Sequence, residues 1–133
     1  MKNDKKKKLL ISYIKSNVAP ILVDFIDGSS IPNSIVLPAD LEITELNGHY
    51  DNVKFVSPDW LNKLDGSTPT ILVIDKIDSI PKNEQIKFVE MLKYRQVSTF
   101  ELPKNTVVVV TAEHINENTI NDEIYSLVAH IKG

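Results

Sequence analysis

The sequence predicts an α/β fold of three layers, α/β/α, in which helices cover both faces of a mainly parallel β-sheet. Two continuous apolar and β-branched runs, 71–74 and 107–110, are typical of central strands buried on both faces. Segments with helical spacing separate the strand-like runs, and strands that alternate with helices form parallel sheets through right-handed crossovers. We therefore expect the two runs to be adjacent, parallel and central, with any chemistry at their carboxyl ends.

Length and composition set the limits of this interpretation. The 133 residues suffice for a single domain, 1–133, and 42% hydrophobic with 25% charged residues is typical of a folded globular chain. The net charge of −3 gives no global electrostatic argument for a nucleic-acid partner, and we do not expect one. The basic run 5–8 is interpreted as a solvated helix start rather than a phosphate-binding arm.

The residue types that are missing exclude several kinds of site. The sequence has no cysteine, which removes disulfides and thiolate chemistry and is typical of the reducing cytoplasm, where we expect the chain. The histidines His49, His114 and His130 lie far apart, so we expect no metal site. No apolar run is long enough for a secretory signal or a membrane span, and we expect no membrane contact.

The first half of the chain predicts few regular elements. Residues 6–18 have the spacing of an amphipathic helix, which Pro20 prevents from continuing, and 21–26 is a buried strand that an Asp-Gly turn ends. Residues 29–52 remain unassigned, although Asn47-Gly48 is a turn signal that could close a small hairpin. A short strand at 53–56 and a short helix after Pro58 follow.

The second half predicts a regular alternation of elements. The strand 71–74 ends at Asp75, and a helix capped by Asn83 runs to about residue 94, with Ile86 among its apolar positions. The second central strand, 106–111, is followed by a polar loop, a short helix near 122–125 and a last strand around 127–131.

The segment 71–81, ILVIDKIDSIP, resembles the Walker B segment of AAA+ ATPases, in which four apolar strand residues precede Asp-Glu and often Ile-Asp. Asp75 and Asp78 match that pattern, and Lys76 stands where the family has glutamate. Thr111 ends the next central strand, where the family keeps its sensor 1 polar residue. The resemblance is greatest to the MoxR group and the clamp-loader subunits, covers about residues 70–132, and implies a P-loop NTPase (AAA+)-like fold.

The same resemblance implies that the residues for ATP hydrolysis are missing. The phosphate loop should read Gly, four residues, Gly-Lys-Ser/Thr, and the stretch in the corresponding place begins at Gly28. There Asn33 replaces the second glycine, Ser34 the lysine and Ile35 the magnesium-binding hydroxyl. Leu127 occupies the position at which the family places the arginine that acts on a neighbouring subunit. We therefore expect no catalytic residue, no bound cofactor and no ATPase activity.

Three functional interpretations follow. The first is a non-catalytic AAA+-like module, a pseudo-ATPase, that docks on another protein such as an active ATPase, a hetero-oligomer or a replication assembly. The second is a weak ATP/ADP-binding switch without turnover, and the third is a DNA-associated accessory protein. A purely structural role for Asp75, Asp78 and Thr111, as side chains that end strands and hold loops, remains an alternative for those three residues.

Overall fold

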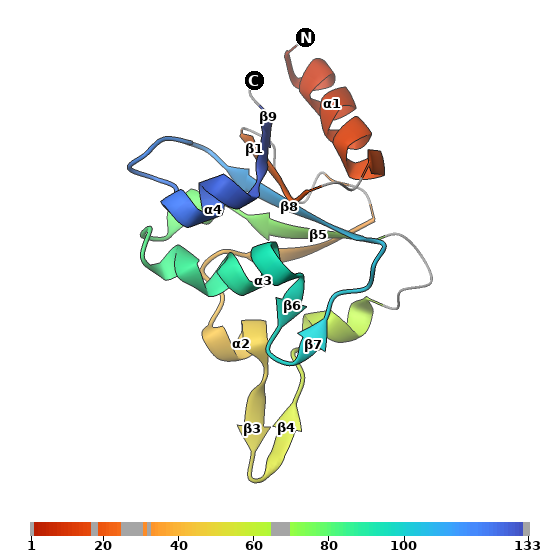
Figure 1. Ribbon diagram of the computed structural model, residues 1–133, viewed down its shortest axis with the longest axis vertical. Helices are drawn as coiled ribbons and strands as arrows, with labels where there is room; N and C mark the ends of the chain where they lie inside the picture. Colours follow the sequence, from red (N-terminus) through yellow and green to blue (C-terminus); the bar gives the residue numbers. More distant parts are fainter. Residues whose placement is uncertain (1, 17–18, 25–30, 32, 65–69, 132–133) are drawn as a thin grey trace.

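Parallel strands form the central sheet of the structure (Figure 1). The computed structural model describes residues 2–16, 19–24, 31, 33–64 and 70–131, and for residues 2–7 and 16 it describes the backbone alone. In this part of the chain the sheet has five strands in the order β2-β5-β8-β1-β9. The strands are β1 (Ile21–Asp24), β2 (Ser34–Pro38), β5 (Thr70–Asp75), β8 (Thr106–Ala112) and β9 (Ala129–Ile131).

The predicted central pair is confirmed. Strands β5 and β8 pair in parallel, with Ile71 opposite Val107 and Ile74 opposite Val110. All seven residues of β8 are buried, as expected for a strand with neighbours on both sides and cover on both faces. The short edge strands β2 and β9 are less buried than β8, and each has a single fully buried residue.

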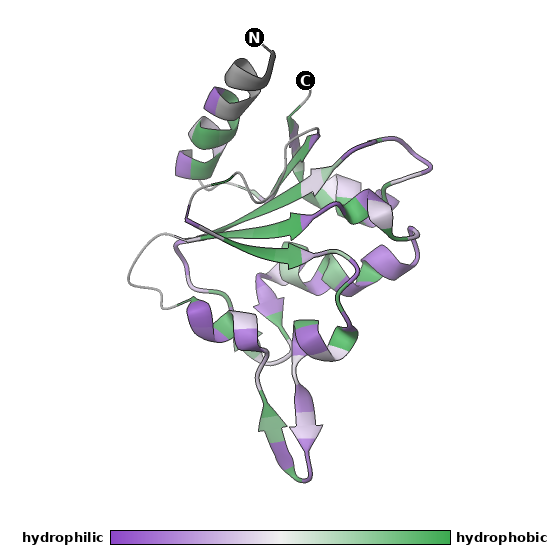
Figure 2. Ribbon diagram, turned by 180° about the vertical axis from the view of Figure 1, so that it is seen from behind, coloured by the Kyte–Doolittle hydropathy of each residue, from purple (hydrophilic) through white to green (hydrophobic). Residues whose placement is uncertain are grey.

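Alternate residues of the strands face two different hydrophobic cores, because successive side chains of a strand point to opposite faces. The apolar character of the strands is visible in Figure 2. The larger core includes Leu22, Leu37, Leu72, Ile74, Val108 and Val110. The smaller core includes Ile21, Val23, Val73, Val107, Val109 and Ile131.

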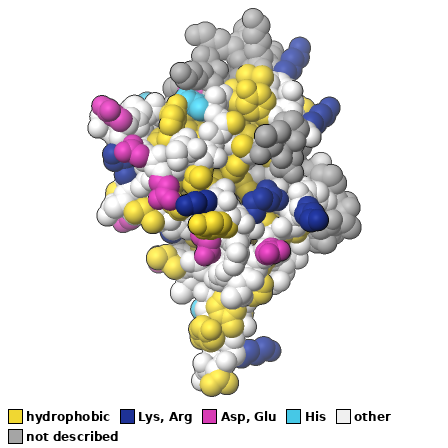
Figure 3. Space-filling view, in the orientation of Figure 1, with side chains coloured by type: hydrophobic (Ala, Val, Ile, Leu, Met, Phe, Trp, Pro, Cys, Tyr) yellow, Lys and Arg dark blue, Asp and Glu magenta, His cyan; other side chains and the backbone are white. Residues whose placement is uncertain are grey.

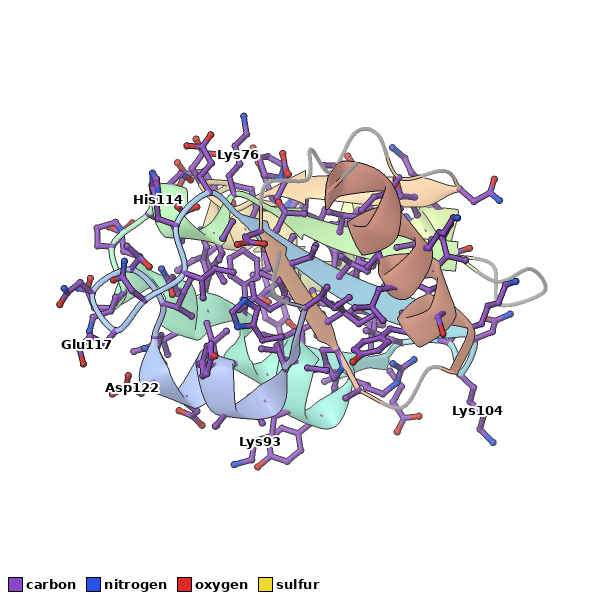
Figure 4. The ribbon with its side chains drawn as sticks, turned by 90° about the horizontal axis from the view of Figure 1, so that it is seen from above. Lys76, Lys93, Lys104, His114, Glu117 and Asp122 are labelled. Carbon is purple, nitrogen blue, oxygen red and sulfur yellow. The ribbon has the colours of Figure 1, made fainter. Side chains whose placement is uncertain are left out.

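Helices cover the two faces unequally. Helix α1 (Lys2–Ser16) covers the smaller core, where Leu10 is buried and Ile14 packs against it. Helices α3 (Val89–Tyr94) and α4 (Asp122–Leu127) lie over the larger core, on the opposite side of the sheet from α1 (Figure 4). The fold is therefore α/β with helices on both faces, as predicted.

The helix predicted from Asn83 is two elements, and its buried face differs from the prediction. A 3₁₀ helix, η4 (Glu84–Phe88), precedes α3, and the side chain of Asn83 makes no capping hydrogen bond. Ile86 is 55% exposed, whereas the neighbouring Gln85 is fully buried. The tighter 3₁₀ turn rotates the residues away from the positions that α-helical spacing predicts.

A hairpin projects from the body between β2 and β5 (Figure 1), but not where the turn signal indicated. Asn47 ends the short helix α2 (Ile43–Asn47), and Gly48 is its C-cap. The hairpin consists of β3 (His49–Asp51) and β4 (Lys54–Val56), which pair in antiparallel register around the turn at Asn52 and Val53. The interpretation of Asn47-Gly48 as the turn of a hairpin is therefore wrong, because the glycine terminates a helix instead.

The remaining elements connect these layers. The predicted short helix after Pro58 is the 3₁₀ helix η2 (Asp59–Lys63), whose Trp60 is buried and donates its indole N–H to the carbonyl oxygen of Leu46 at 3.1 Å. A small hairpin of β6 (Gln96–Val97) and β7 (Phe100–Glu101) follows α3. Its Phe100 ring stacks on Phe55 of the β3–β4 hairpin at 5.7 Å between ring centroids.

Gly48 makes the base of the projecting hairpin possible, which leads to a stability prediction. Its φ is +84°, and a Cβ at this position would lie 2.4 Å from the carbonyl oxygen of Val56. We expect Gly48→Ala to lower the free energy of unfolding by about 1–3 kcal/mol, measured by urea denaturation.

The matched control for Gly48→Ala is Asn52→Gly. Asn52 has a φ of 57° and stands in the hairpin turn, where glycine is tolerated without strain. Its free energy of unfolding should change by less than about 0.5 kcal/mol. Equal stability of the Gly48→Ala variant and the natural sequence would contradict the close approach at Gly48.

Candidate functional site

The polar residues singled out in the sequence meet at the carboxyl edge of the sheet. Strands β5 and β8 run in parallel, so Asp75 at the end of β5 comes beside Thr111 near the end of β8. The 3₁₀ helix η3 (Ile77–Ser79) begins directly after Asp75 and Lys76. The structure therefore brings Asp75, Lys76, Asp78 and Thr111 together, as the parallel topology predicts.

The hydroxyl of Thr111 connects the two central strands at this edge. It donates a hydrogen bond to Oδ1 of Asp75 at 2.6 Å and accepts one from the backbone N–H of Lys76 at 2.9 Å. The side chain of Thr111 is only 1% exposed, so water does not replace these partners. A buried hydroxyl that both donates and accepts has its hydrogen-bonding capacity largely filled.

Lys76 directs its side chain into solvent. Its backbone is left-handed, with φ 59° and ψ 56°, and it precedes η3 as the N-cap residue. The side chain is exposed, and the structure records no ion pair between its ammonium group and a carboxylate of the described residues. The described contacts of Lys76 are therefore those of its backbone, and its side chain is solvated. An exposed ammonium group at this position has no acceptor with which to orient a water molecule.

Asp78 fastens η3 to the loop that follows β8. Its carboxylate accepts the backbone N–H of Glu113 at 3.1 and 3.2 Å and the N–H of His114 at 2.8 Å. Both donors lie in the loop over the carboxyl edge (Figure 4). Hydrogen bonds to a charged carboxylate are among the stronger ones, so this contact orders the loop. The structural interpretation of Asp78 is the one that its contacts support.

Gln85 is a buried polar residue near the carboxyl edge that could not be identified from the sequence. Its amide nitrogen donates to the carbonyl oxygens of Ile77, Ile80 and Thr119 at 3.1, 3.2 and 2.7 Å, and its amide oxygen accepts the N–H of Asn121 at 2.8 Å. The fully buried side chain thus joins η3, η4 and the loop before α4. No sequence signal distinguished it from the exposed polar residues beside it.

Asn121 also joins the segment before η4 to the start of α4. Its side-chain oxygen caps α4 by accepting the N–H groups of Glu123 at 2.9 Å and Ile124 at 3.4 Å, and its amide nitrogen donates to the carbonyl oxygen of Lys82 at 3.2 Å. Asparagine is a favoured N-cap residue, so this role could have been predicted from the sequence.

The predicted remnant of a phosphate loop does not lie at this edge. Ser34 and Ile35 are the first residues of β2, which is parallel to β5, so they lie at the amino edge of the sheet, opposite from Asp75. The hydroxyl of Ser34 donates to the carbonyl oxygen of Ile31 at 2.6 Å. Asn33 is exposed, with a φ of 55°, and Gly28 lies outside the described residues. This part of the predicted loop is therefore a strand, because the β-branched run 35–36 continues the sheet.

Leu127 is the last residue of α4 and packs, partly buried, against the larger core. A leucine in this contact contributes by burial of apolar surface, and it has no polar group to offer a neighbouring subunit.

Open space near the carboxyl edge is lined by acidic rather than basic residues. A cavity of about 260 Å³ lies beside the loop after β8, and its charged lining residues are Glu117 and Asp122. Carboxylates repel phosphate groups, so this cavity does not favour a nucleotide. No group of three or more His, Asp or Glu side chains among the described residues is placed to hold a metal ion. In the described part of the chain no helix combines the length and the apolar character needed to cross a membrane.

Two crystal structures of NtrX from Brucella abortus share the fold. One has a TM-score of 0.61 at 13% sequence identity, and the match covers 95% of this chain and 34% of the NtrX chain. The other, in complex with ADP, has a TM-score of 0.62 at 13% identity and covers 96% and 34% of the two chains. This chain thus spans about a third of the NtrX chain. The likeness supports the predicted α/β fold with a mainly parallel sheet. The sequence matches no family model and no curated protein.

The contacts of Thr111 lead to a prediction about stability. Thr111→Val keeps the shape of the side chain and removes the hydroxyl, which leaves the N–H of Lys76 without its acceptor and Oδ1 of Asp75 without this donor. We expect the free energy of unfolding to fall by about 1–3 kcal/mol in urea denaturation, because buried polar groups lose their partners.

Thr111→Ser is the control, since serine retains the donor and the acceptor and loses only a methyl group. It should be the more stable of the two variants. If the valine variant is as stable as the serine variant, the hydroxyl does not hold the two strand ends together.

Proposed function

We propose that this chain is a non-catalytic, AAA+-like interaction module, a pseudo-ATPase that uses the fold as a scaffold for binding another protein. The observation that carries the proposal is the use of polar groups at the carboxyl edge. Thr111 holds Asp75 and Lys76, and Asp78 holds the loop at Glu113 and His114. Groups that an ATPase would direct at Mg²⁺ and water serve here to connect the chain to itself.

The position of β2 supports the absence of a phosphate site. A phosphate loop ends in Lys-Ser/Thr and opens a helix. Ser34 and Ile35 stand at the expected positions of the lysine and the hydroxyl, and they begin the strand β2 instead of a helix.

Two substituted positions support the same proposal. Lys76 stands where the resemblance places the glutamate that polarises water, and its side chain is exposed. Leu127 stands where it places an arginine, and its side chain packs against the core. Both side chains fit their surroundings, and a small movement of either would not supply the missing carboxylate or guanidinium group.

A weak nucleotide-binding switch remains a second candidate, because one of the NtrX structures that share the fold is in complex with ADP. Such a switch would need donors for the phosphates of the nucleotide. The backbone N–H groups of Lys76, Glu113 and His114 at the carboxyl edge already have acceptors within the chain. This occupancy makes the switch the weaker of the two proposals. The third interpretation, a DNA-associated accessory protein, has no support at this edge.

The β3–β4 hairpin supports a role in protein binding. Its apolar side chains are unusually accessible: Val53 is 97% exposed and Tyr50 is 73% exposed. The ring of Tyr50 contacts Phe55 edge to face at 5.0 Å between centroids, and Phe55 stacks on Phe100 in turn. The hairpin is therefore anchored at its base while its tip presents an apolar surface (Figure 3). Exposed apolar groups on a projecting element are typical of protein interaction sites.

The first test concerns catalysis. Lys76→Glu restores the residue that the Walker B resemblance requires, at an exposed position where the change should not disturb the fold. We expect no ATP hydrolysis in a phosphate-release assay, because a carboxylate can orient water only when a γ-phosphate is held about 3 Å beyond it.

The assay uses Asp75→Asn in the Lys76→Glu background as the matched control, since it keeps the size of the side chain and removes its charge. Turnover by Lys76→Glu that clearly exceeds the control would show that a competent phosphate site exists, and the pseudo-ATPase proposal would be wrong.

The second test concerns the partner. A photo-crosslinking residue at Val53 in living cells should form a discrete adduct with another protein, and the adduct should disappear when Tyr50→Ser removes the neighbouring ring. The same residue at Glu113, which is exposed on the loop at the carboxyl edge, is the control. Adducts of equal yield at both positions, or none at Val53, would contradict a docking role of the hairpin tip.

A further inference from the structure

A groove lies beside the edge strand β2, where the sheet meets the base of the projecting hairpin. It has a volume of about 430 Å³, and residues of β2, α2, η2 and the β3–β4 hairpin line it. In Figure 1, α2 and the hairpin lie on the β2 side of the sheet. The apolar part of the lining includes Leu37, Leu41, Val56, Pro58 and Trp60.

The outer edge of β2 offers backbone hydrogen bonds beside this groove. Among the described residues, β2 pairs with β5 alone. The N–H of Ala39 donates to the carbonyl oxygen of Asp75 at 3.0 Å, just beyond the end of the strand. Backbone groups of successive strand residues point to opposite sides, so the N–H and C=O of Val36 point away from β5. The structure records no hydrogen bond between these two groups and any residue that it describes.

An N–H and a C=O on an edge strand fit an extended chain better than a helix. Val36 is 37% exposed, so there is access to this edge. A helix pairs its backbone groups internally, whereas an extended segment laid along β2 would return a C=O and an N–H to Val36. The side chains of such a strand alternate between the two faces of the sheet. Those on the face of the larger core, to which Leu37 belongs, would enter the groove.

Charged side chains around the groove are available as well. Glu45, Asp59 and Lys63 line it and are exposed, and the structure records no ion pair or hydrogen bond between their side chains and another described residue. Two carboxylates against one ammonium group favour a segment with basic residues, by an amount that salt reduces at an exposed rim. An apolar floor within a polar rim is typical of a pocket for the anchoring side chain of a protein partner.

We propose that this groove binds an extended segment of a partner protein, which adds to β2 as a further strand and places an apolar side chain against Trp60 and Leu41. Basic residues flank that side chain. Pro38 has no N–H and ends the free edge, so the added strand is short. The inference rests on the proposed function as a protein interaction module, and it names the form that the partner takes at this surface.

The probe for the test is a synthetic peptide of about seven residues, within the usual length of a strand, in which valine and leucine alternate with threonine between terminal lysines. Trp60 is the only tryptophan of the sequence and lines the groove, so its fluorescence reports occupancy. We expect a saturable change in its emission below about 1 mM peptide. In ¹⁵N-labelled protein, the amide of Val36 should gain protection from hydrogen exchange at saturation, because it acquires an acceptor.

The groove is tested by filling it from an exposed position. Thr44 is exposed on α2 and lines the groove, and we expect Thr44→Phe to weaken peptide binding about tenfold or more, because the ring takes the place of the anchoring side chain. Ile43→Phe is the matched control, since Ile43 is 60% exposed on the same helix and is not part of the lining. It should bind the peptide as the natural sequence does.

The edge is tested through the backbone of both partners. Val36→Pro removes the N–H that points away from β5, a place where edge strands tolerate proline, and should weaken binding about fivefold or more. Val36→Thr keeps the N–H and should bind normally, and circular dichroism checks that both variants retain the sheet. An added strand pairs along one of its edges. Methylation of one alternate set of peptide amide nitrogens should therefore abolish binding, and methylation of the other set should retain it.

The charges are tested with a double substitution on the rim. Glu45→Gln with Asp59→Asn should weaken binding of the lysine-ended peptide about two- to fivefold at low salt, and by less at high salt. Asp40→Asn with Glu42→Gln removes the same charge from exposed positions that do not line the groove, and it should leave the affinity unchanged.

Several results would overturn the inference. They are no saturable change in emission up to about 1 mM peptide, no gain in protection at Val36, equal binding by the Thr44→Phe and Ile43→Phe variants, equal effects of the two methylated peptides, and tighter binding of a peptide with glutamates in place of the lysines. A peptide that fails to bind while the adduct at Val53 still forms would leave the role of the hairpin intact. Loss of that adduct with peptide binding retained would contradict the role of the hairpin alone.

Discussion

The complete burial of β8 is the constraint on which the rest of the structure depends. Its seven buried residues must find hydrogen-bonding partners for the backbone on both sides and apolar cover on both faces. Strands β5 and β1 supply the backbone partners, and the two cores supply the cover. Because β5 and β8 are parallel neighbours, their carboxyl ends are forced together. The contact between Asp75 and Thr111 is a direct consequence of that register.

The carboxyl edge then determines what the molecule can do. A nucleotide-hydrolysing site on such a sheet needs donors and carboxylates that remain available to a ligand. Here Thr111 and Asp78 join neighbouring segments, and Gln85 and Asn121 extend the same network to α4. An accessible apolar surface lies elsewhere, at the tip of the β3–β4 hairpin.

The sequence predicts the central sheet well because continuous β-branched runs have few alternatives to a buried parallel strand. It predicts the meeting of Asp75, Asp78 and Thr111 for the same reason, since the ends of parallel strands share an edge. It fails where one short signal has two meanings: Asn47-Gly48 ends a helix instead of closing a hairpin. It also fails at Gln85 and Ile86, because a 3₁₀ turn exchanges the buried and exposed positions. The strand β2 could not be predicted, since it is held in the sheet by β5, which is distant in sequence.

The central claim is that the polar groups of the carboxyl edge are committed to the fold and do not receive a nucleotide. The most direct measurement is a titration of the ¹⁵N-labelled protein with Mg²⁺-ATP, followed by NMR at the backbone amides of Lys76, Glu113 and His114, which donate to Thr111 and Asp78. The account predicts that these three resonances stay in place up to millimolar nucleotide. Saturable shifts at these amides, with loss of their protection from hydrogen exchange, would contradict it.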